Sequence, residues 1–221
     1  MSIVKGLKDL NKALDKPSDS DNSKARWVKL ADGESVKIRF LQELDPDSPN
    51  YNDKFGCGFI ALEHTNPKDY RRKALDTMES EGRDWANEQH RKDYKAGWKA
   101  RSRLYINVLL DDGKEEPYVA ILSQGTSGKS ITPTLIEYAG EMGSITNLVW
   151  RIKRNGTGTD TSYTIIPLAK DESPFDLSSL ELYDLEKTAV RYVPYSEQES
   201  FYMGKDDNTD KSSGSENNIE W

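Results

Sequence analysis

Residues 99–110 read Lys-Ala-Arg-Ser-Arg-Leu-Tyr-Ile-Asn-Val-Leu-Leu, a row of cations that runs directly into an alternating apolar stretch. The alternation predicts a β-strand, in which side chains two positions apart lie on one face at roughly 6.5–7 Å spacing. Lys99, Arg101 and Arg103 would then match the spacing of phosphates in an extended single strand, with Tyr105 next on the same face. Cations follow phosphates and aromatic rings stack on any base, so the stretch favours sequence-independent binding of single-stranded nucleic acid. A charged strand edge that resists aggregation would have the same sequence pattern.

The charge of the chain is unevenly distributed. The net charge is -7, yet residues 1–170 hold 27 Lys and Arg against 25 Asp and Glu, whereas residues 171–221 hold 4 against 13. The acidity therefore belongs to the C-terminal part, and the overall sum does not argue against a nucleic-acid partner. With one cysteine, Cys57, no internal disulfide can form. No segment approaches about 18 consecutive apolar residues, so we expect no membrane contact and a cytosolic location.

Alternating apolar segments separated by turns predict a mainly β (α+β) fold. We expect strands at 35–41, 104–110, 118–122, 148–154 and 163–168, with 27–30 and 35–41 forming a hairpin and a helix at 135–142. Residues 67–98 have few β-branched residues and apolar residues at helical intervals, which predicts a helical insertion whose solvated face would include Arg71, Arg72 and Lys73. Five strands with a helix between two of them fit a five-stranded Greek-key barrel of the oligonucleotide-binding (OB) type with flanking helices.

We divide the chain into four parts. Residues 24–170 form the binding core, including the insertion at about 67–98. Residues 1–23 form a basic amphipathic arm, in which Ile3, Leu7, Leu10 and Leu14 recur at helical spacing; the arm could dock on its own domain or mediate self-association. Residues 171–204 form a helical segment, with a helix at 176–192 that Pro194 ends. Residues 205–221 are too polar to offset their ordering entropy and form an acidic tail.

Further candidate contacts share the chemistry of the first stretch: cations on strands or on the helical insertion, with aromatic residues among them. The complete set of candidate single-stranded DNA (ssDNA) contacts is Lys37, Arg39, Arg91, Lys92, Lys95, Trp98, Lys99, Arg101, Arg103, Tyr105, Trp150, Arg151, Lys153 and Arg154. Aromatic residues of this size also suit a barrel core, and we expect about half of the bulky aromatics near these positions to be buried there.

In order along the chain, three stretches resemble the phage T4-type single-stranded DNA-binding (helix-destabilising) proteins of tailed phages. These are Trp27–Leu30 through Ile38–Leu41, the cation-Ser run Lys99–Arg103 into Leu109, and Trp150–Arg154 to Tyr163. The resemblance covers about residues 26–168. It implies an OB-fold core that coats ssDNA in replication, recombination and repair inside the infected host's cytoplasm, and a tail that recruits replication or recombination proteins. The candidate tail residues are Asp206, Asp207, Asp210, Glu216, Glu220 and Trp221.

The resemblance also implies a structural zinc held by a His and Cys cluster. This chain departs from that pattern, because it offers only Cys57, His64 and His90 and no Cys-x-x-Cys pair. A tetrahedral structural site needs four ligands, so we expect no metal and no other cofactor.

Catalytic motifs are weak. Gly125-Thr-Ser-Gly-Lys-Ser130 has two residues between its glycines where a phosphate-binding loop needs four. The carboxylate pairs at 111–112 and 115–116 lie in a turn without metal-binding neighbours, and the two histidines are far apart in the sequence. We therefore expect no enzyme activity. The competing hypothesis is a protein-interaction adaptor built on the same barrel, in which the aromatic residues are core.

Overall fold

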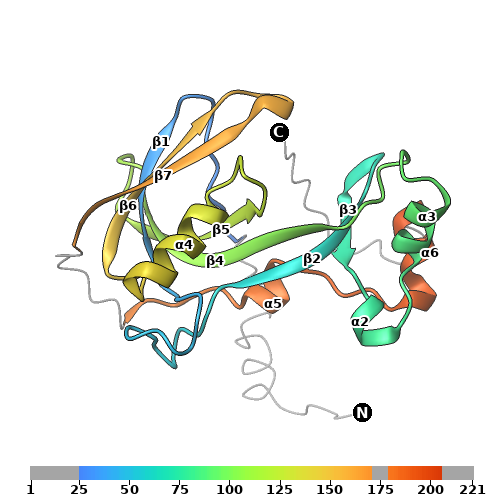
Figure 1. The fold of residues 1–221 in the computed structure, drawn as a ribbon, viewed down its shortest axis with the longest axis horizontal. Helices are drawn as coiled ribbons and strands as arrows, with labels where there is room; N and C mark the ends of the chain where they lie inside the picture. Colours follow the sequence, from blue (N-terminus) through green and yellow to red (C-terminus); the bar gives the residue numbers. More distant parts are fainter. Residues whose placement is uncertain (1–24, 171–178, 206–221) are drawn as a thin grey trace, which may run out of the picture.

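The computed structural model describes residues 25–170 and 179–205, which fold mainly as one antiparallel sheet of seven strands with a few helices (Figure 1). The predicted arm of residues 1–23 and all the candidate tail residues lie outside the described part of the chain. The elements are β1 (Ser35–Phe40), β2 (Phe59–Asn66), β3 (Asp69–Leu75), α2 (Met78–Glu81), α3 (Trp85–Lys92), β4 (Arg101–Asp111), β5 (Tyr118–Gly125), α4 (Thr132–Met142), β6 (Leu148–Asn155), η1 (Gly158–Asp160), β7 (Ser162–Lys170), α5 (Leu185–Thr188) and α6 (Tyr195–Met203).

The strand order is β3-β2-β4-β1-β6-β7, and β5 pairs with β4 outside this path. β4 is the central strand. Its first half pairs with β2, from Arg101 opposite Glu63 to Tyr105 opposite Phe59, and its second half pairs with β1. β5 runs along the opposite edge of β4. This long strand therefore connects two lobes, which Figure 1 shows at its two ends.

The main lobe contains β1, the second half of β4, β5, α4, β6 and β7. Every second residue of β4, namely Leu104, Ile106, Val108 and Leu110, points into its core, as the period of a strand requires. The core also takes Val36, Ile38 and Phe40 from β1 and Leu135 from α4. α4 thus covers the face of the sheet to which Leu104, Ile106, Val108 and Leu110 point.

The second lobe, which we call the wing, consists of β3, α2, α3 and α6 (Figure 1, right). Its core is aromatic: Trp85 stacks on Tyr202 with ring centroids 5.8 Å apart, and Phe201 and Ala74 pack beside them. The wing therefore joins a segment before β4 to the last described helix. Among the described residues, no helix is both long and apolar enough to cross a bilayer.

Most predicted strands and the helix at 135–142 are confirmed, but three local predictions are wrong. Residues 69–75, expected in a helix, form β3, because pairing with β2 overrides their weak strand propensity. The turn at Ala31–Glu34 exists, yet residues 27–30 do not pair with β1; Trp27 bridges to Ile121 of β5. Of the helix predicted at 176–192, the described residues 179–192 form only the short α5 (Leu185–Thr188) and a 3-10 position at Ser179, so Pro194 does not end it. Its fixed φ of -61° instead suits the position just before α6.

Candidate nucleic-acid interface

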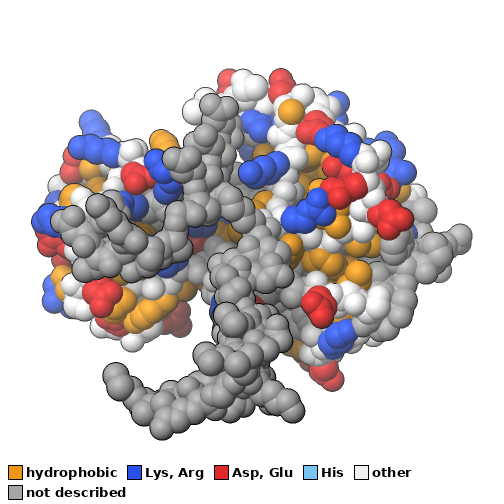
Figure 2. All heavy atoms as spheres, turned by 180° about the vertical axis from the view of Figure 1, so that it is seen from behind, with side chains coloured by type: hydrophobic (Ala, Val, Ile, Leu, Met, Phe, Trp, Pro, Cys, Tyr) orange, Lys and Arg blue, Asp and Glu red, His pale blue; other side chains and the backbone are white. Residues whose placement is uncertain are grey.

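The first group of candidate contacts lies on the wing. Arg91, Lys92, Lys95, Lys99 and Arg101 run from the end of α3 to the start of β4, and all five are exposed. The last turn of α3 is basic, which complements the partial negative charge at the C-terminal end of a helix. Figure 2 shows Lys and Arg side chains around the outer edge of this lobe, at the left. We call these five residues the wing cations.

Two exposed tyrosines accompany the wing cations. The loop after α3 turns against the β2–β3 turn: Gly97 has a φ of 87°, and a Cβ there would lie 3.0 Å from the Pro67 ring. This contact brings Tyr94, 76% exposed, and Tyr70, 61% exposed, to the same end of the wing. Sequence reasoning missed Tyr70, although an aromatic residue inside the cationic run 68–73 was a usable signal.

The second group lies on the outer face of the main lobe. Lys37 of β1 is directly opposite Arg151 of β6, and Ser35 is opposite Lys153. Lys37, Arg151 and Lys153 are exposed, so these predicted positions are available for contact. Ile166 of β7 lies opposite Arg151 and is 44% exposed. This surface, which we call the main-lobe patch, therefore combines cations with an aliphatic side chain.

Tyr105 and Trp150 are not available for stacking, which corrects two predictions. Tyr105 is fully buried because the face of β4 that carries it is covered by α5 and by Trp27, whose ring centroid is 6.3 Å away. Trp150 is 1% exposed in the main core, where its indole Nε1 donates to the Ile145 carbonyl at 2.9 Å. Both residues are core aromatics.

Several other predicted contacts have structural roles. Arg154 is half-buried, and its guanidinium donates to the Leu30 carbonyl at 2.8 Å. Arg103 is half-buried and donates to the Ser123 hydroxyl at 3.0 Å. Arg39 is half-buried opposite Leu109. Trp98 is half-buried against Trp85, with ring centroids 5.2 Å apart, and belongs to the wing core.

The cations do not form one continuous row. Between the wing cations and the main-lobe patch, the segment of residues 183–190 crosses the outer face of β4. Asn107 of β4 is fully buried beneath it and exchanges two hydrogen bonds with the backbone of Tyr183, at 3.0 and 3.1 Å. Lys99 precedes β4, so the predicted row of three keeps only Arg101 and Arg103 on the strand.

A charged triad supports the start of β4. The Tyr105 hydroxyl donates to Glu63 at 2.8 Å, and Lys73 lies 3.1 Å from the same carboxylate and contacts the Tyr105 hydroxyl. Burial, followed by the neighbouring Glu63 charge, raises the pKa of Tyr105 far above its usual range. Burial also lowers the pKa of Lys73, against the opposing effect of Glu63. The triad fixes Tyr105 as a structural residue.

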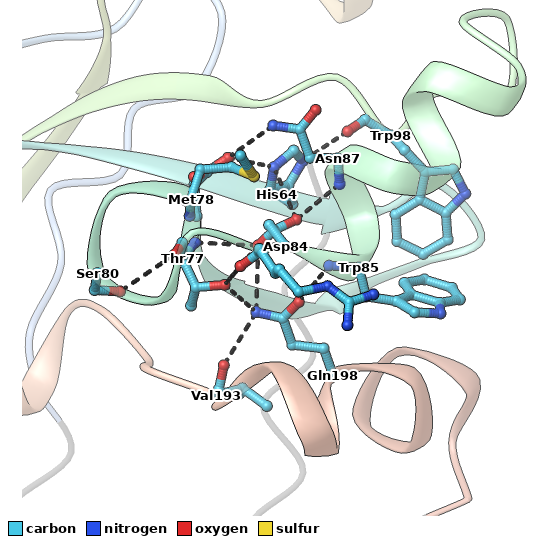
Figure 3. Close-up of polar contacts among 12 residues, drawn as sticks. His64, Thr77, Met78, Ser80, Asp84, Trp85, Asn87, Trp98, Val193 and Gln198 are labelled. Atoms are coloured by element: carbon cyan, nitrogen blue, oxygen red, sulfur yellow. Dashed lines mark hydrogen bonds and ion pairs between the residues drawn. The ribbon is translucent and has the colours of Figure 1, made fainter.

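One buried group of side chains could in principle hold a metal ion. His64, Asp76 and Asp84 each place a ligand atom within 4.8 Å of the others. Figure 3 shows His64 and Asp84 pointing toward one another. Cys57 and His90 are not part of it. Cys57 bridges to Glu43 in the main lobe, and His90 packs on the Tyr94 ring.

No protein-family model matches the chain, and no curated protein matches it significantly.

Proposed function

We propose that the chain is a sequence-independent ssDNA-binding protein. The observation that carries the proposal is the exposure of the five wing cations and of the rings of Tyr70 and Tyr94, which belong to β3, to the end of α3, to the loop after it and to the start of β4. Cations of this kind neutralise phosphates without reading sequence, and exposed rings stack on any base. The resemblance to the T4-type proteins points to the same activity.

The remaining parts of the proposal follow from the resemblance and the sequence. The strands of the main lobe correspond to an OB-type core, and the protein coats ssDNA during phage replication, recombination and repair in the host cytoplasm, without catalysing a reaction. The acidic tail recruits partner proteins. Because a tethered anionic segment has an effective concentration of order millimolar, it also competes with ssDNA for the cations.

The wing and the main-lobe patch bind different parts of the same ssDNA strand. A short strand occupies the wing end, where the tyrosines are, and a longer one extends past residues 183–190 to Lys37, Arg151 and Lys153. Footprints of about 4–16 nucleotides per OB fold leave room for both surfaces.

Fluorescence anisotropy with labelled oligo(dT) tests this division. The double variant Lys92→Glu/Lys95→Glu should weaken binding of both short and long oligomers and lower the slope of log affinity against log salt by about 0.7 for each lost phosphate contact. Lys37→Glu/Lys153→Glu should weaken only the long oligomer. Lys114→Glu, an exposed cation in the β4–β5 turn, is the matched control. Equal affinity of the wing variant and the control would refute the proposal.

One observation favours a second candidate, an adaptor that binds acidic peptides. Ile166 and Leu168 are 44% and 37% exposed on β7, which ends the strand order of the sheet, beside Arg151. Aliphatic side chains beside cations suit an acidic, apolar peptide better than they suit bases. An adaptor would show little affinity for oligo(dT) at any salt concentration, so the same titration separates the two functions.

A further inference from the structure

The strongest unassigned feature is the buried ionisable group of His64, Asp76 and Asp84, whose side chains are 1%, 5% and 0% exposed. Buried charges are costly unless each is paired and hydrogen-bonded. The group joins β2 to both helices that precede β4. The partner that neutralises the two buried carboxylates is therefore also the partner that stabilises the wing.

Each carboxylate already has a structural task. Asp76 accepts a hydrogen bond from the backbone amide of Met78, the first residue of α2, at 2.8 Å. Asp84 is the N-cap of α3 and accepts the amide of Asn87 at 2.7 Å. A carboxylate at a helix N-terminus is stabilised by the unpaired amides and by the helix dipole. Asp84 is thus the N-cap of α3, and Asp76, which precedes the N-cap Thr77, accepts the first amide of α2.

The second oxygen of Asp84 ties the group to α6. It accepts the backbone amide of Thr77 at 3.1 Å and the side-chain amide of Gln198 at 3.2 Å. Gln198 is fully buried; its other amide atom, Oε1, accepts the amide of Trp85 at 2.7 Å, and its Nε2 also reaches the Val193 carbonyl (Figure 3). One polar network therefore connects β2, α2, α3 and α6.

The His64 ring lies between acceptors on both sides. Its Nδ1 lies 2.6 Å from the Trp98 carbonyl oxygen, which can only accept, so Nδ1 carries a hydrogen. Its Nε2 lies 2.8 Å from a carboxylate oxygen of Asp76 and 3.3 Å from one of Asp84, so each ring nitrogen faces an acceptor. An imidazolium between two carboxylates satisfies every polar contact of the ring.

A structural zinc does not fit these donors. Such sites take four Cys or His ligands, and this group offers one imidazole and two carboxylates. The nearby Asn87 side-chain amide points its nitrogen, a donor, toward Asp76 at 3.5 Å. Cys57 pairs with Glu43 and His90 packs on Tyr94, so neither residue adds a ligand to the group.

We propose that the wing is held by this metal-independent His64–Asp76–Asp84 ion cluster and not by a structural zinc. The inference concerns the folding of the wing and is independent of the proposed ssDNA binding. The full chain should fold and hold its wing with no metal bound.

Metal content and thermal unfolding of the full chain give the first test. Elemental analysis of the purified protein should find far less than one metal ion per chain, and neither EDTA nor added Zn²⁺ should shift the Tm. One ion per chain, or a Tm that falls on chelation, would overturn the proposal.

Nitrogen-15 NMR of the imidazole rings gives a second test that does not depend on mutation. His64 should show two protonated ring nitrogens with slowly exchanging hydrogens, whereas a metal-bound ring would show one protonated nitrogen only. His64→Gln should lower the Tm by roughly 10 °C, because it leaves two buried carboxylates without their cation. His90→Gln, the other histidine of the chain, is the matched control and should shift the Tm little. A His64 ring with one bare nitrogen would contradict the ion cluster even if both variants fold.

Discussion

Replacing Tyr105 with Phe separates a structural role from a DNA-binding role at this position. The ring is fully buried, and its hydroxyl donates to Glu63 at 2.8 Å while Lys73 contacts the same hydroxyl. A hydrogen bond to a charged group contributes about 1.5–3 kcal/mol. The Lys73–Glu63 ion pair at 3.1 Å survives the substitution, so we expect a loss of unfolding free energy within that range. For a chain of this size, this corresponds to a Tm lower by roughly 3–12 °C.

The affinity for oligo(dT) should change by less than about twofold in Tyr105→Phe, because a base cannot reach a covered ring. Tyr94→Ala is the comparison. Its ring is 76% exposed, so removing it should leave the Tm nearly unchanged and cost about 1–3 kcal/mol of binding, or roughly 5- to 150-fold in affinity. Urea unfolding and fluorescence anisotropy measure the two effects on the same samples. A Tyr105→Phe protein of normal stability with tenfold weaker binding would refute the assignment of Tyr105 to the core.

Three further outcomes are expected. Glu43→Gln should lower the unfolding free energy by about 2–4 kcal/mol in urea melts, because the buried carboxylate accepts four hydrogen bonds from residues 144–146. Glu137→Gln, at an exposed position of α4, should leave it unchanged. Burial raises the pKa of both Tyr105 and Tyr202, so the folded state favours their neutral forms. The free energy of unfolding should therefore stay constant below about pH 10 and fall above it. Tyr202→Phe should make this alkaline fall smaller in pH-dependent melts. Removing residues 205–221 should tighten oligo(dT) binding and reduce its salt dependence, and unchanged affinity would count against tail competition.

The strands of the main lobe could be predicted because their residues alternate between core and solvent. Leu104, Ile106 and Val108 carry this pattern, and the structure places all three in one core. β3 could not be predicted, since its sequence has few β-branched residues and its conformation is set by pairing with β2, which lies earlier in the chain. The alternation of apolar and polar residues therefore predicts a strand only where one face of that strand is buried in a core.

The candidate contacts were predicted unevenly for a related reason. Exposure of cations such as Lys37 and Lys92 follows from charge alone and is confirmed. The fate of an aromatic residue depends on what covers it, and Tyr105 is covered by α5, which lies about eighty residues later. The contact of Asp76 and Asp84 with His64 could not be predicted from the sequence, because only the fold brings the three residues together.

The crossing of β4 by residues 183–190 limits how far the protein can be shortened. A version that stops at residue 170 would uncover Tyr105 and Asn107, leave the Asn107 amide without its Tyr183 partners, and strip Phe201 and Tyr202 from the aromatic centre of the wing. Such a fragment would present fresh apolar surface to solvent and tend to aggregate. The smallest piece of the chain worth expressing for binding studies therefore extends through Gly204, the C-cap of α6.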